Sequence, residues 1–400
     1  MTAHPRLDGP VPFARPDITE TEIQAMADAV RSGWLTTGPN AASLENEFKR
    51  FLGNPNLEAV ALNSATAGLH LALEGLGIGP GDEVIVPTWT FTATAEVVEY
   101  VGATPVFVDS DPETLNLDLE AANRAVTRRT RAIIPVHFAG MPISRSALSD
   151  FACVHGLVVV EDAAHAFPVM NEGRYVGDGL SEAVVFSFYA TKTMTTGEGG
   201  MLVTPDVELA RRARMMRLHG INRDAFARAV SHEPAWHYNV EAAGYKYNLP
   251  DPLAALGRVQ LSRAIEMRAA RERIAATYSE LLAGLPLILP TAAREDNGHS
   301  WHLYVVRLSE LADISRDEFI EQLTDCGIST SVHFIPLHLQ PYWRSAYQLR
   351  SEDFPVASAA YPTVVSLPIF SAMSRDQVDR VARTIHSVLT PPVTSLRRST

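Results

Sequence analysis

The sequence predicts an α/β protein whose larger domain is a mostly parallel, seven-stranded sheet wrapped by helices and whose smaller C-terminal domain is α+β. Two observations lead to this prediction. Short apolar runs alternate with helix-length segments between residues 58 and 204, and after Asn248 the chain changes to a long helical pattern rich in Ala, Leu and Arg. Such alternation is typical of a parallel sheet with crossover helices, and 400 residues suffice for two domains.

The seven runs are apolar on both faces, as expected for strands buried inside a sheet. They span residues 58–62, 83–87, 104–108, 132–136, 157–161, 183–187 and 200–204. Segments such as residues 66–77 and 117–126 are long enough for crossover helices. The Thr- and Gly-rich gap between Ser187 and Gly200 is too short for one, so we expect the last strand to be antiparallel.

The second domain begins with the long helical pattern at residues 252–285, which we expect to lead away from the sheet. Strands are expected near residues 302–308 and 329–334, and helices near residues 315–326 and 374–389. We therefore predict a large cofactor-binding domain at residues 1–250 and a small domain at residues 251–400.

Charge and composition exclude several classes of function. The formal net charge is −12, whereas nucleic acids and anionic membranes are bound by broad basic surfaces, so neither partner is expected. The two cysteines, Cys153 and Cys326, lack metal-site spacing, so no zinc site or disulfide is expected. No apolar run has the length of a membrane helix or a signal peptide, and we expect a cytoplasmic protein.

Lysine is rare in this chain. Of the 34 basic residues, only Lys49, Lys192 and Lys246 are lysines. Arginine stays protonated and cannot form an imine, so a lysine that is retained can do chemistry that arginine cannot. The alternative is codon preference with chance survival, which is our interpretation of Lys49.

Lys192 follows a predicted strand, and ligands of parallel sheets gather at the carboxyl ends of strands. Its amine could form an imine with an aldehyde cofactor and act as a general base when released; an ordinary surface lysine is the alternative. Asp162 also follows an apolar run, where a carboxylate needs a partner. A protonated pyridine nitrogen is one such partner, and a helix cap or a metal ion is the alternative.

Two further motifs fit a phosphorylated aromatic cofactor. Residues 63–68, Asn-Ser-Ala-Thr-Ala-Gly, open a predicted helix whose free N–H groups could hold a phosphate, and Ser187 could add a hydroxyl; an ordinary helix cap is the alternative. Trp89 and Phe91 follow another strand, and one of them could stack on a ring. Packing in the core is the alternative for either aromatic residue.

Taken in order, these motifs resemble the sugar aminotransferases of the DegT/DnrJ/EryC1/StrS family. The resemblance is carried by Ser-Ala-Thr at 64–66, Pro-Thr-Trp-Thr-Phe at 87–91, Glu-Asp-Ala-Ala-His-Ala at 161–166, Phe-Ser-Phe at 186–188 with Lys192, Thr-Gly-Glu-Gly-Gly at 196–200 and Gly-Tyr-Lys-Tyr-Asn at 244–248. Residues 32–39 and Ser-Trp-His at 300–302 also match, so the resemblance spans nearly the entire chain.

The resemblance implies the aspartate-aminotransferase-type fold (PLP fold type I) and pyridoxal 5'-phosphate (PLP) as cofactor. By position, Lys192 would bind PLP through an imine, Asp162 would contact its pyridine nitrogen, Phe91 would stack on its ring and His165 would lie beside it. The expected phosphate ligands are Ala65, Thr66, Ser187 and, from the neighbouring subunit of a homodimer with shared sites, Asn248. Some relatives carry histidine instead of this lysine and act as dehydratases, so Lys192 favours amino transfer.

Within the family, residues 32–39, 63–68, 134–137 and 244–248 are most similar to the enzymes that make UDP-4-amino-4-deoxy-L-arabinose. This similarity implies transfer of an amino group from glutamate, which becomes 2-oxoglutarate, to C4 of a nucleotide-linked 4-keto sugar. The expected substrate-binding residues are Trp89, Lys246, His333 and His338, with Arg217, His219 and Arg223 as further candidates. The middle of residues 331–338 differs from the arabinose enzymes, which leaves the sugar open.

Three alternatives remain. An aminotransferase for 3-keto sugars or cyclitols would share every cofactor residue and differ in its substrate pocket. A dehydratase would share the cofactor but is disfavoured by Lys192. A PLP-binding regulator without enzymatic activity would need a DNA-binding or effector segment, and the acidic chain offers no room for one outside the two domains.

Overall fold

A seven-stranded sheet lies at the centre of the larger lobe of the computed structural model, which describes residues 9–223, 236–292 and 298–390. Its strands, in spatial order, are β1 (Glu58–Leu62), β9 (Gly200–Thr204), β8 (Ala183–Ser187), β5 (Val158–Asp162), β4 (Thr130–Ile133), β2 (Glu83–Pro87) and β3 (Thr104–Val108). The pairs from β8 to β3 are parallel, whereas β9 is antiparallel to both β8 and β1. The predicted mostly parallel sheet and its antiparallel last strand are therefore confirmed.

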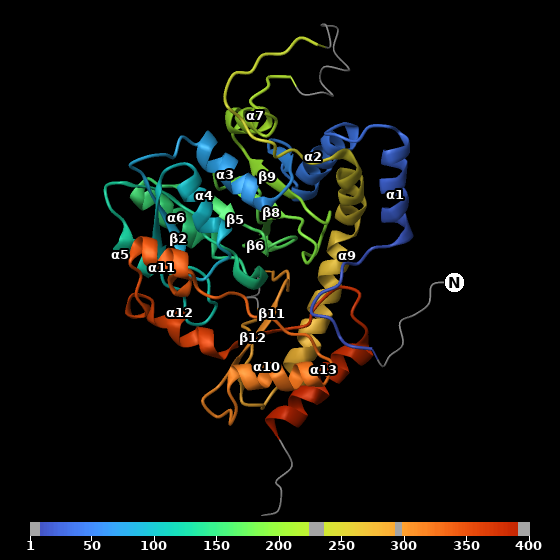
Figure 1. Ribbon diagram of the computed structural model, residues 1–400, viewed down its shortest axis with the longest axis vertical. Coiled ribbons are helices and arrows are strands. Elements are labelled where there is room, and N and C mark those ends of the chain that lie inside the picture. The colour runs from blue at the N-terminus through green and yellow to red at the C-terminus, as the bar shows by residue number, and fades with distance from the viewer. Residues whose placement is uncertain (1–8, 224–235, 293–297, 391–400) are drawn as a thin grey trace, which may run out of the picture.

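Alternate residues of each strand point to opposite faces of this sheet and into different hydrophobic clusters. In β8, Val185 packs in the cluster of one face, whereas Val184 and Phe186 pack in the cluster of the other. Helices cover both faces (Figure 1). The first face carries α3 (Ala65–Gly75), α4 (Ala93–Tyr100) and α7 (Val207–Met216), and the second carries α2 (Pro39–Leu52), α5 (Leu119–Ala125), α6 (Arg145–His155) and the beginning of α9 (Asp251–Leu281).

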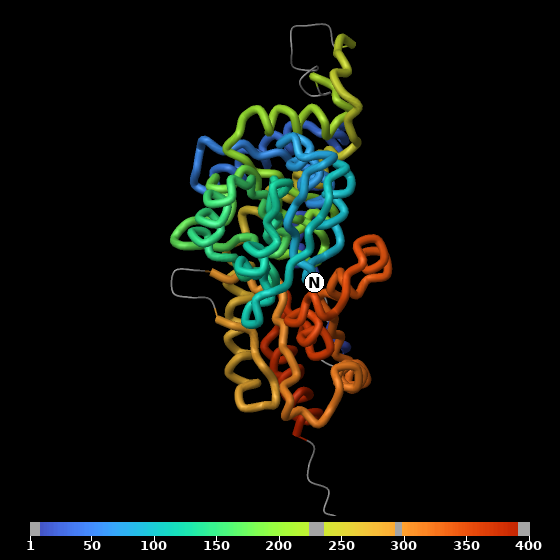
Figure 2. Tube along the Cα trace, turned by 90° about the vertical axis from the view of Figure 1, so that its left-hand side faces the viewer, coloured from blue at the N-terminus to red at the C-terminus, as the bar shows by residue number. Residues whose placement is uncertain are grey.

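The smaller lobe is built on an antiparallel sheet of three strands, β10 (Leu287–Ile288), β11 (Tyr304–Leu308) and β12 (Val364–Leu367). Tyr278 of α9, Phe319 and Ile385 share one hydrophobic cluster with this sheet. They come from the end of α9, from α10 (Arg316–Asp325) and from α13 (Arg375–Leu389). Helix α9 thus runs from the large sheet to the small one, and Figure 2 shows the C-terminal part of the chain below the large lobe.

The remaining elements are short or peripheral. They are α1 (Glu20–Arg31), α11 (Pro341–Tyr347), α12 (Pro355–Ala360), and a two-stranded ribbon of β6 (Met170–Asn171) and β7 (Arg174–Tyr175). Helix α1 packs along α9. No helix within the described ranges has the length and apolar character needed to cross a membrane.

One predicted strand is wrong. Residues 329–334 do not form a strand, since only Ser331 pairs there, in an isolated bridge with Ser366 of β12. Beyond this bridge the segment turns its side chains, among them His333 and Phe334, into a cavity instead of continuing along the sheet edge. The strand that neighbours β11 is β12, whose four residues are too few to show a periodic pattern in the sequence.

Other boundaries move by a few residues. The strand expected at residues 157–161 is β5, Val158–Asp162, so Asp162 is its last residue. The long helix expected at residues 252–285 is α9, Asp251–Leu281, and it packs against both sheets. The division into domains at residue 250 stays a prediction, because α9 contributes to the cores of both lobes.

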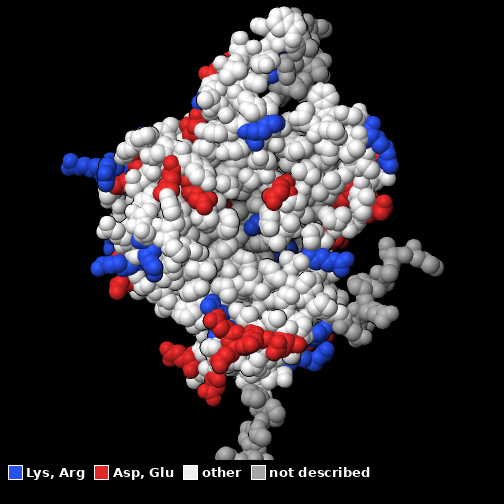
Figure 3. Space-filling model, viewed as in Figure 1, with Lys and Arg blue, Asp and Glu red and all other residues white. Residues whose placement is uncertain are grey.

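Acidic side chains gather on the small lobe over α10, whereas Lys and Arg are scattered over the face seen in Figure 3. Helix α10 itself carries Asp317, Glu318, Glu321 and Asp325. On this face, no broad basic surface is visible among the described residues.

Candidate active site

A cavity of about 540 Å³ opens at the carboxyl ends of the parallel strands, where both lobes contribute its walls. The large lobe supplies Asp162, which ends β5, and Lys192, from the loop between β8 and β9. The small lobe supplies His302 and His333. Residues far apart in the sequence therefore meet at the edge of the sheet where ligands of parallel sheets bind.

The amine of Lys192 is buried in this cavity, and its Nζ lies 3.3 Å from Nε2 of His302. Burial lowers the pKa of Lys192 to about 7, with a further lowering by Arg271 and an opposing effect of Asp162. An amine with such a pKa is largely uncharged just above neutral pH and can act as a nucleophile or a base.

Asp162 is buried, and burial raises the pKa of its carboxyl group. Its Oδ2 accepts a hydrogen bond from Thr94 Oγ1 at 2.9 Å and its Oδ1 one from the Ala164 amide at 3.1 Å. No ion pair in the described part of the chain includes Asp162. A protonated ring nitrogen in the cavity would give this carboxylate the positive partner that its burial calls for.

The N-terminal turn of α3 forms another wall of the cavity. Ser64 caps this helix by accepting a hydrogen bond from the Ala67 amide, and Ala65 and Thr66 line the cavity. The backbone of β9 lies so close that a Cβ at Gly200 would be 2.7 Å from the Ala65 nitrogen. First-turn amides have no partner within a helix, so this wall of the cavity fits a phosphate group.

Two rings expected to lie near the cofactor also line the cavity. The side chain of Phe91 is 58% exposed, which leaves its face free to stack on a ligand. His165 accepts a hydrogen bond from the Ala139 amide through Nδ1 at 3.2 Å, which puts the proton of the neutral ring on Nε2. Its pKa is lowered well below 6.5 by burial and by Lys192. The neutral ring of His165 can therefore donate a hydrogen bond into the site.

Together these features fit PLP. The donor set comprises an imine-forming amine at Lys192, a carboxylate at Asp162 for the ring nitrogen, an exposed aromatic face at Phe91 and a helix N-terminus for the phosphate. Ser187 also lines the cavity and completes the set predicted from this subunit.

Three of the cavity residues to which the sequence prediction gives no role are His302, Phe13 and Phe334, each with an aromatic or imidazole ring. His302 belongs to the matched Ser-Trp-His motif but carries no assignment there. Phe13 stacks on the ring of His333, with centroids 5.3 Å apart, and Phe334 stacks on His165 at 5.8 Å. The signals in the sequence were the motif at residues 300–302 for His302 and the segment at residues 331–338 for Phe334; nothing near Phe13 indicated a site.

Two residues expected to bind substrate are placed elsewhere. Trp89 is fully buried and does not line the cavity; its Nε1 donates to the carbonyl of His333 at 3.2 Å. His338 is buried between the hydroxyls of Thr88 and Ser358, with distances of 2.8 and 2.9 Å from its ring nitrogens. The polar atoms of both side chains are already paired with protein groups, so neither is free to bind substrate in this subunit.

Lys246 and Asn248 do not line the cavity of their own chain. They are hydrogen-bonded to each other, and Asn248 also donates to Thr37 Oγ1 at 2.8 Å. Arg217 forms a buried ion pair with Glu45 at 2.5 Å, which gives it a structural position rather than the predicted contact with substrate. Neither His219 nor Arg223 is among the lining residues.

Comparison with known proteins gives consistent matches over almost the full length. The profile of the DegT/DnrJ/EryC1/StrS aminotransferase family matches residues 16–386. The spore coat polysaccharide biosynthesis protein SpsC of Bacillus subtilis is 44% identical over 381 residues, which cover 95% of this chain and 97% of SpsC.

Solved structures agree with this match. The candidate sugar aminotransferase Spr1654 of Streptococcus pneumoniae, in its PLP form, has a TM-score of 0.86 and 33% identity, with 95% of this chain and 98% of that chain covered. DesV of S. venezuelae, in complex with a ketimine intermediate, has a TM-score of 0.86 and 36% identity, with coverage of 96% and 99%. PseC of Helicobacter pylori, an aminotransferase involved in pseudoaminic acid biosynthesis, has a TM-score of 0.86 and 25% identity, with coverage of 95% and 99%.

Proposed function

Because the chain belongs to the DegT/DnrJ/EryC1/StrS aminotransferase family, we propose that it transfers an amino group from glutamate to C4 of a nucleotide-linked 4-keto sugar. Amino transfer to sugars, PLP as cofactor and PLP fold type I follow from the family and from the solved relatives. The observation that carries the proposal is the meeting of Lys192 and Asp162 in one cavity.

When bound, PLP supplies an electron sink that stabilises negative charge on the carbon beside the transferred nitrogen. Lys192 holds the cofactor and moves the proton at that carbon, since its amine can be charged or uncharged near neutral pH. Asp162 keeps the ring nitrogen protonated. Phe91 fixes the plane of the ring, so that the bond to be broken can align with the ring's π system.

The phosphate is bound by Ala65, Thr66 and Ser187. All three residues line the cavity, which supports this role. Lys192 is the only Lys or Arg side chain among the described lining residues. The charges of PLP and of a nucleotide diphosphate therefore need cationic and amide groups from outside this subunit. In the proposed homodimer, Asn248 and Lys246 of the neighbouring subunit supply them.

The substrate end of the cavity is formed by His333, Phe13 and Phe334 in the proposed complex. Trp89 acts there through its hydrogen bond to the carbonyl of His333, and His338 through its hydrogen bonds to Thr88 and Ser358. The choice of C4 rests on the similarity of residues 32–39 and 244–248 to the arabinose enzymes. The proposal also includes a large domain at residues 1–250 and a small domain at residues 251–400. It places the protein in the cytoplasm.

The cofactor assignment is tested by absorption spectroscopy. PLP-loaded wild-type protein should show a visible band, and glutamate should bleach it. Lys192→Ala should lack the band, whereas Lys49→Ala should keep it, because Lys49 lies outside the cavity and near Glu58, with 3.8 Å between Nζ and Oε1. A wild-type protein without such a band, or a Lys192→Ala variant that retains it, would refute the assignment.

The substrate assignment needs a panel of nucleotide-linked 4-keto and 3-keto sugars, assayed with ¹⁵N-glutamate. We expect ¹⁵N at C4 of one or more 4-keto sugars and none in reactions with Lys192→Ala. Transfer to 3-keto sugars or cyclitols alone would replace the C4 assignment by the alternative activity. A protein that forms the PLP band but aminates no member of the panel would support the regulator alternative.

A further inference from the structure

Arg271, in the second half of α9, is a buried cation that forms no ion pair with a carboxylate among the described residues. The residue is 3% exposed, and no ion pair of the described chain includes it. Its guanidinium is instead held by backbone carbonyls: Nη1 donates to Trp301 at 3.2 Å, to His302 at 3.3 Å and to Ile369 at 3.0 Å. Nη2 donates to the carbonyl of Thr191 at 3.5 Å.

Such a group is expensive to bury. Burial lowers the pKa of Arg271 to about 10, although the negative charge of Asp17 raises it in part. The Nε atom of Arg271 has no hydrogen-bond partner among the described residues. Aliphatic side chains usually fill a buried position at lower cost than an unpaired charge. A cation held at this position therefore calls for a reason beyond packing.

The contacts of Arg271 lead to Lys192 from two sides. Thr191 directly precedes Lys192, and His302 is the residue whose Nε2 lies 3.3 Å from its amine. The guanidinium of Arg271 thus binds the carbonyl of Thr191, next to Lys192 in the chain, and the carbonyl of His302, whose ring contacts the amine. It fixes both without contacting the amine.

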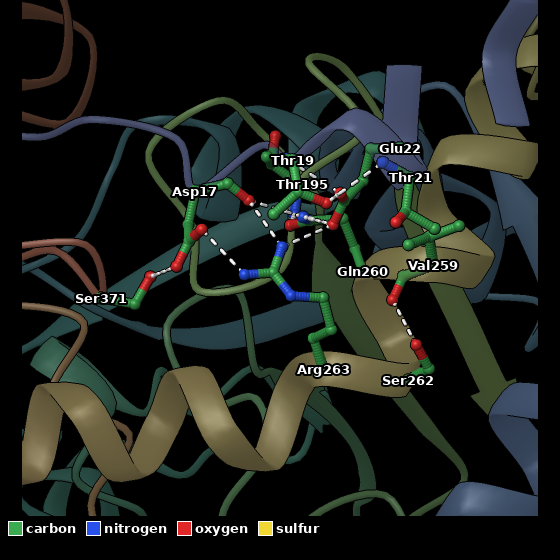
Figure 4. Close-up of polar contacts among 10 residues, drawn as sticks. All are labelled: Asp17, Thr19, Thr21, Glu22, Thr195, Val259, Gln260, Ser262, Arg263 and Ser371. Atoms are coloured by element: carbon green, nitrogen blue, oxygen red, sulfur yellow. Dashed lines mark hydrogen bonds and ion pairs between the residues drawn. The ribbon is translucent and has the colours of Figure 1, made fainter. Parts of the chain in front are cut away.

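Helix α9 holds the other end of the same loop through Gln260, about three turns before Arg271. The Gln260 side chain accepts a hydrogen bond from the Thr195 amide at 3.3 Å and donates to Asp17 and Glu22 at 2.9 and 2.8 Å (Figure 4). Gln260 is uncharged, so it provides a natural control: it restrains the lysine loop from the same helix without adding charge.

We propose that Arg271 is a positioning residue for Lys192: it fixes the two groups that flank the amine, and its positive charge disfavours a second positive charge at Lys192. This inference rests on the proposed role of Lys192 in binding the cofactor. It does not depend on which sugar is aminated.

Several other groups face Lys192. Asp162 of β5 favours the charged amine and so opposes Arg271. His165, His302 and His333 are kept neutral near pH 7 because burial lowers their pKa values, that of His333 to about 4. Glu198 and Tyr189, from the loop of Lys192, also line the cavity. Arg271 stays charged over the pH range in which Lys192 titrates, since its own pKa is about 10.

The test uses the small number of lysines. Full-length protein labelled with [ε-¹³C]lysine and freed of PLP should give three side-chain NMR signals, and Lys192→Ala identifies one of them. In the wild type, the Lys192 signal should titrate near pH 7. In Arg271→Met the midpoint should rise by about one unit, the size expected for two charges separated by several ångströms in a protein.

A control variant and kinetic measurements distinguish the effect of the Arg271 charge from the effect of restraining the loop that carries Lys192. Gln260→Leu should leave the Lys192 midpoint within about 0.3 units of the wild type, and Arg271→Gln gives the same test as Arg271→Met if the latter does not fold. In the PLP-loaded enzymes, the pH dependence of the half-reaction with glutamate, in which the Lys192 amine is released, should move in the same direction as the midpoint. A wild-type midpoint near 10, an unchanged midpoint in both Arg271 variants, or an equal rise in Gln260→Leu would overturn the proposal.

Discussion

Nζ of Lys192 and Nε2 of His302 lie 3.3 Å apart, although 110 positions separate the two residues in the sequence. Burial lowers the pKa of His302 well below 6.5, so the ring is neutral at physiological pH. Which of the two nitrogens donates depends on the tautomer of the ring and on the charge of the amine. The small lobe thereby supplies a hydrogen-bond partner for the reactive amine of the large lobe.

Replacement of His302 should reduce turnover. In His302→Leu the amine loses its hydrogen-bond partner, and we expect kcat to fall about tenfold, which corresponds to about 1.4 kcal/mol, the size of one hydrogen bond. His299→Leu is the matched control, because His299 is also buried but stacks on Trp301 and does not line the cavity. Steady-state kinetics should show a loss of kcat in the His302 variant only; equal losses would indicate a general effect on the lobe.

The pKa of Lys192 predicts a pH dependence. Burial lowers this pKa to about 7, so the uncharged amine predominates above pH 7 and the ammonium below it. The rate of a step in which the released amine takes up a proton should therefore rise through pH 7 and fall about tenfold per unit below it. Stopped-flow measurement of the half-reaction with glutamate, from pH 5 to 9, tests this. A flat profile between pH 6 and 9 would contradict it.

Asp162→Asn should separate activity from stability. The amide cannot keep a ring nitrogen protonated, and we expect kcat to fall by about 100-fold or more, a loss of about 2.7 kcal/mol. Without PLP the variant should be at least as stable as the wild type, because a buried carboxylate whose pKa is raised is costly. Assays of PLP-loaded enzyme and thermal unfolding of PLP-free protein give both quantities; a destabilised PLP-free variant would argue for a structural role.

The pairing of Asp162 and Lys192 could be predicted because it follows from strand order. Strands β5 and β8 are parallel neighbours, and Asp162 lies opposite Val185 of β8. The carboxyl ends of adjacent parallel strands meet at one edge, so residues that follow two such strands are brought together. Apolar runs on both faces were sufficient to identify these strands in the sequence.

The positions of His302 and Arg271 could not be predicted in this way. His302 precedes a strand of the other lobe, and its approach to Lys192 depends on how the two lobes pack, which local patterns do not encode. Arg271 stands in a helix with several arginines, of which Arg263 and Arg268 form ion pairs at 2.8 and 3.2 Å. Only the packing of α9 against both sheets shows that Arg271 is the buried one.

Glu22 should contribute to stability without contacting the cavity. Its side chain is fully buried and accepts hydrogen bonds from Gln260 at 2.8 Å and from Arg263 at 2.6 Å (Figure 4). Burial alone would raise its pKa, but hydrogen bonds from Thr19, Arg263 and Gln260 lower it to about 2. We expect Glu22→Gln to lower the free energy of unfolding by about 2 kcal/mol, less than for a fully buried pair because Arg263 is partly exposed.

The pH dependence of this loss gives a second measure. Since the folded-state pKa of Glu22 is lowered from 4.5 to about 2, its contribution is fully present above pH 4.5 and disappears as the pH falls towards 2. Urea unfolding of the wild type and Glu22→Gln should therefore differ at pH 7 and converge near pH 2. Glu20→Gln, an exposed change in the first turn of the same helix, should cost less than about 0.5 kcal/mol at either pH. A difference between the wild type and Glu22→Gln that is the same at pH 7 and pH 3 would show that packing, and not the charge of Glu22, stabilises the N-terminal segment.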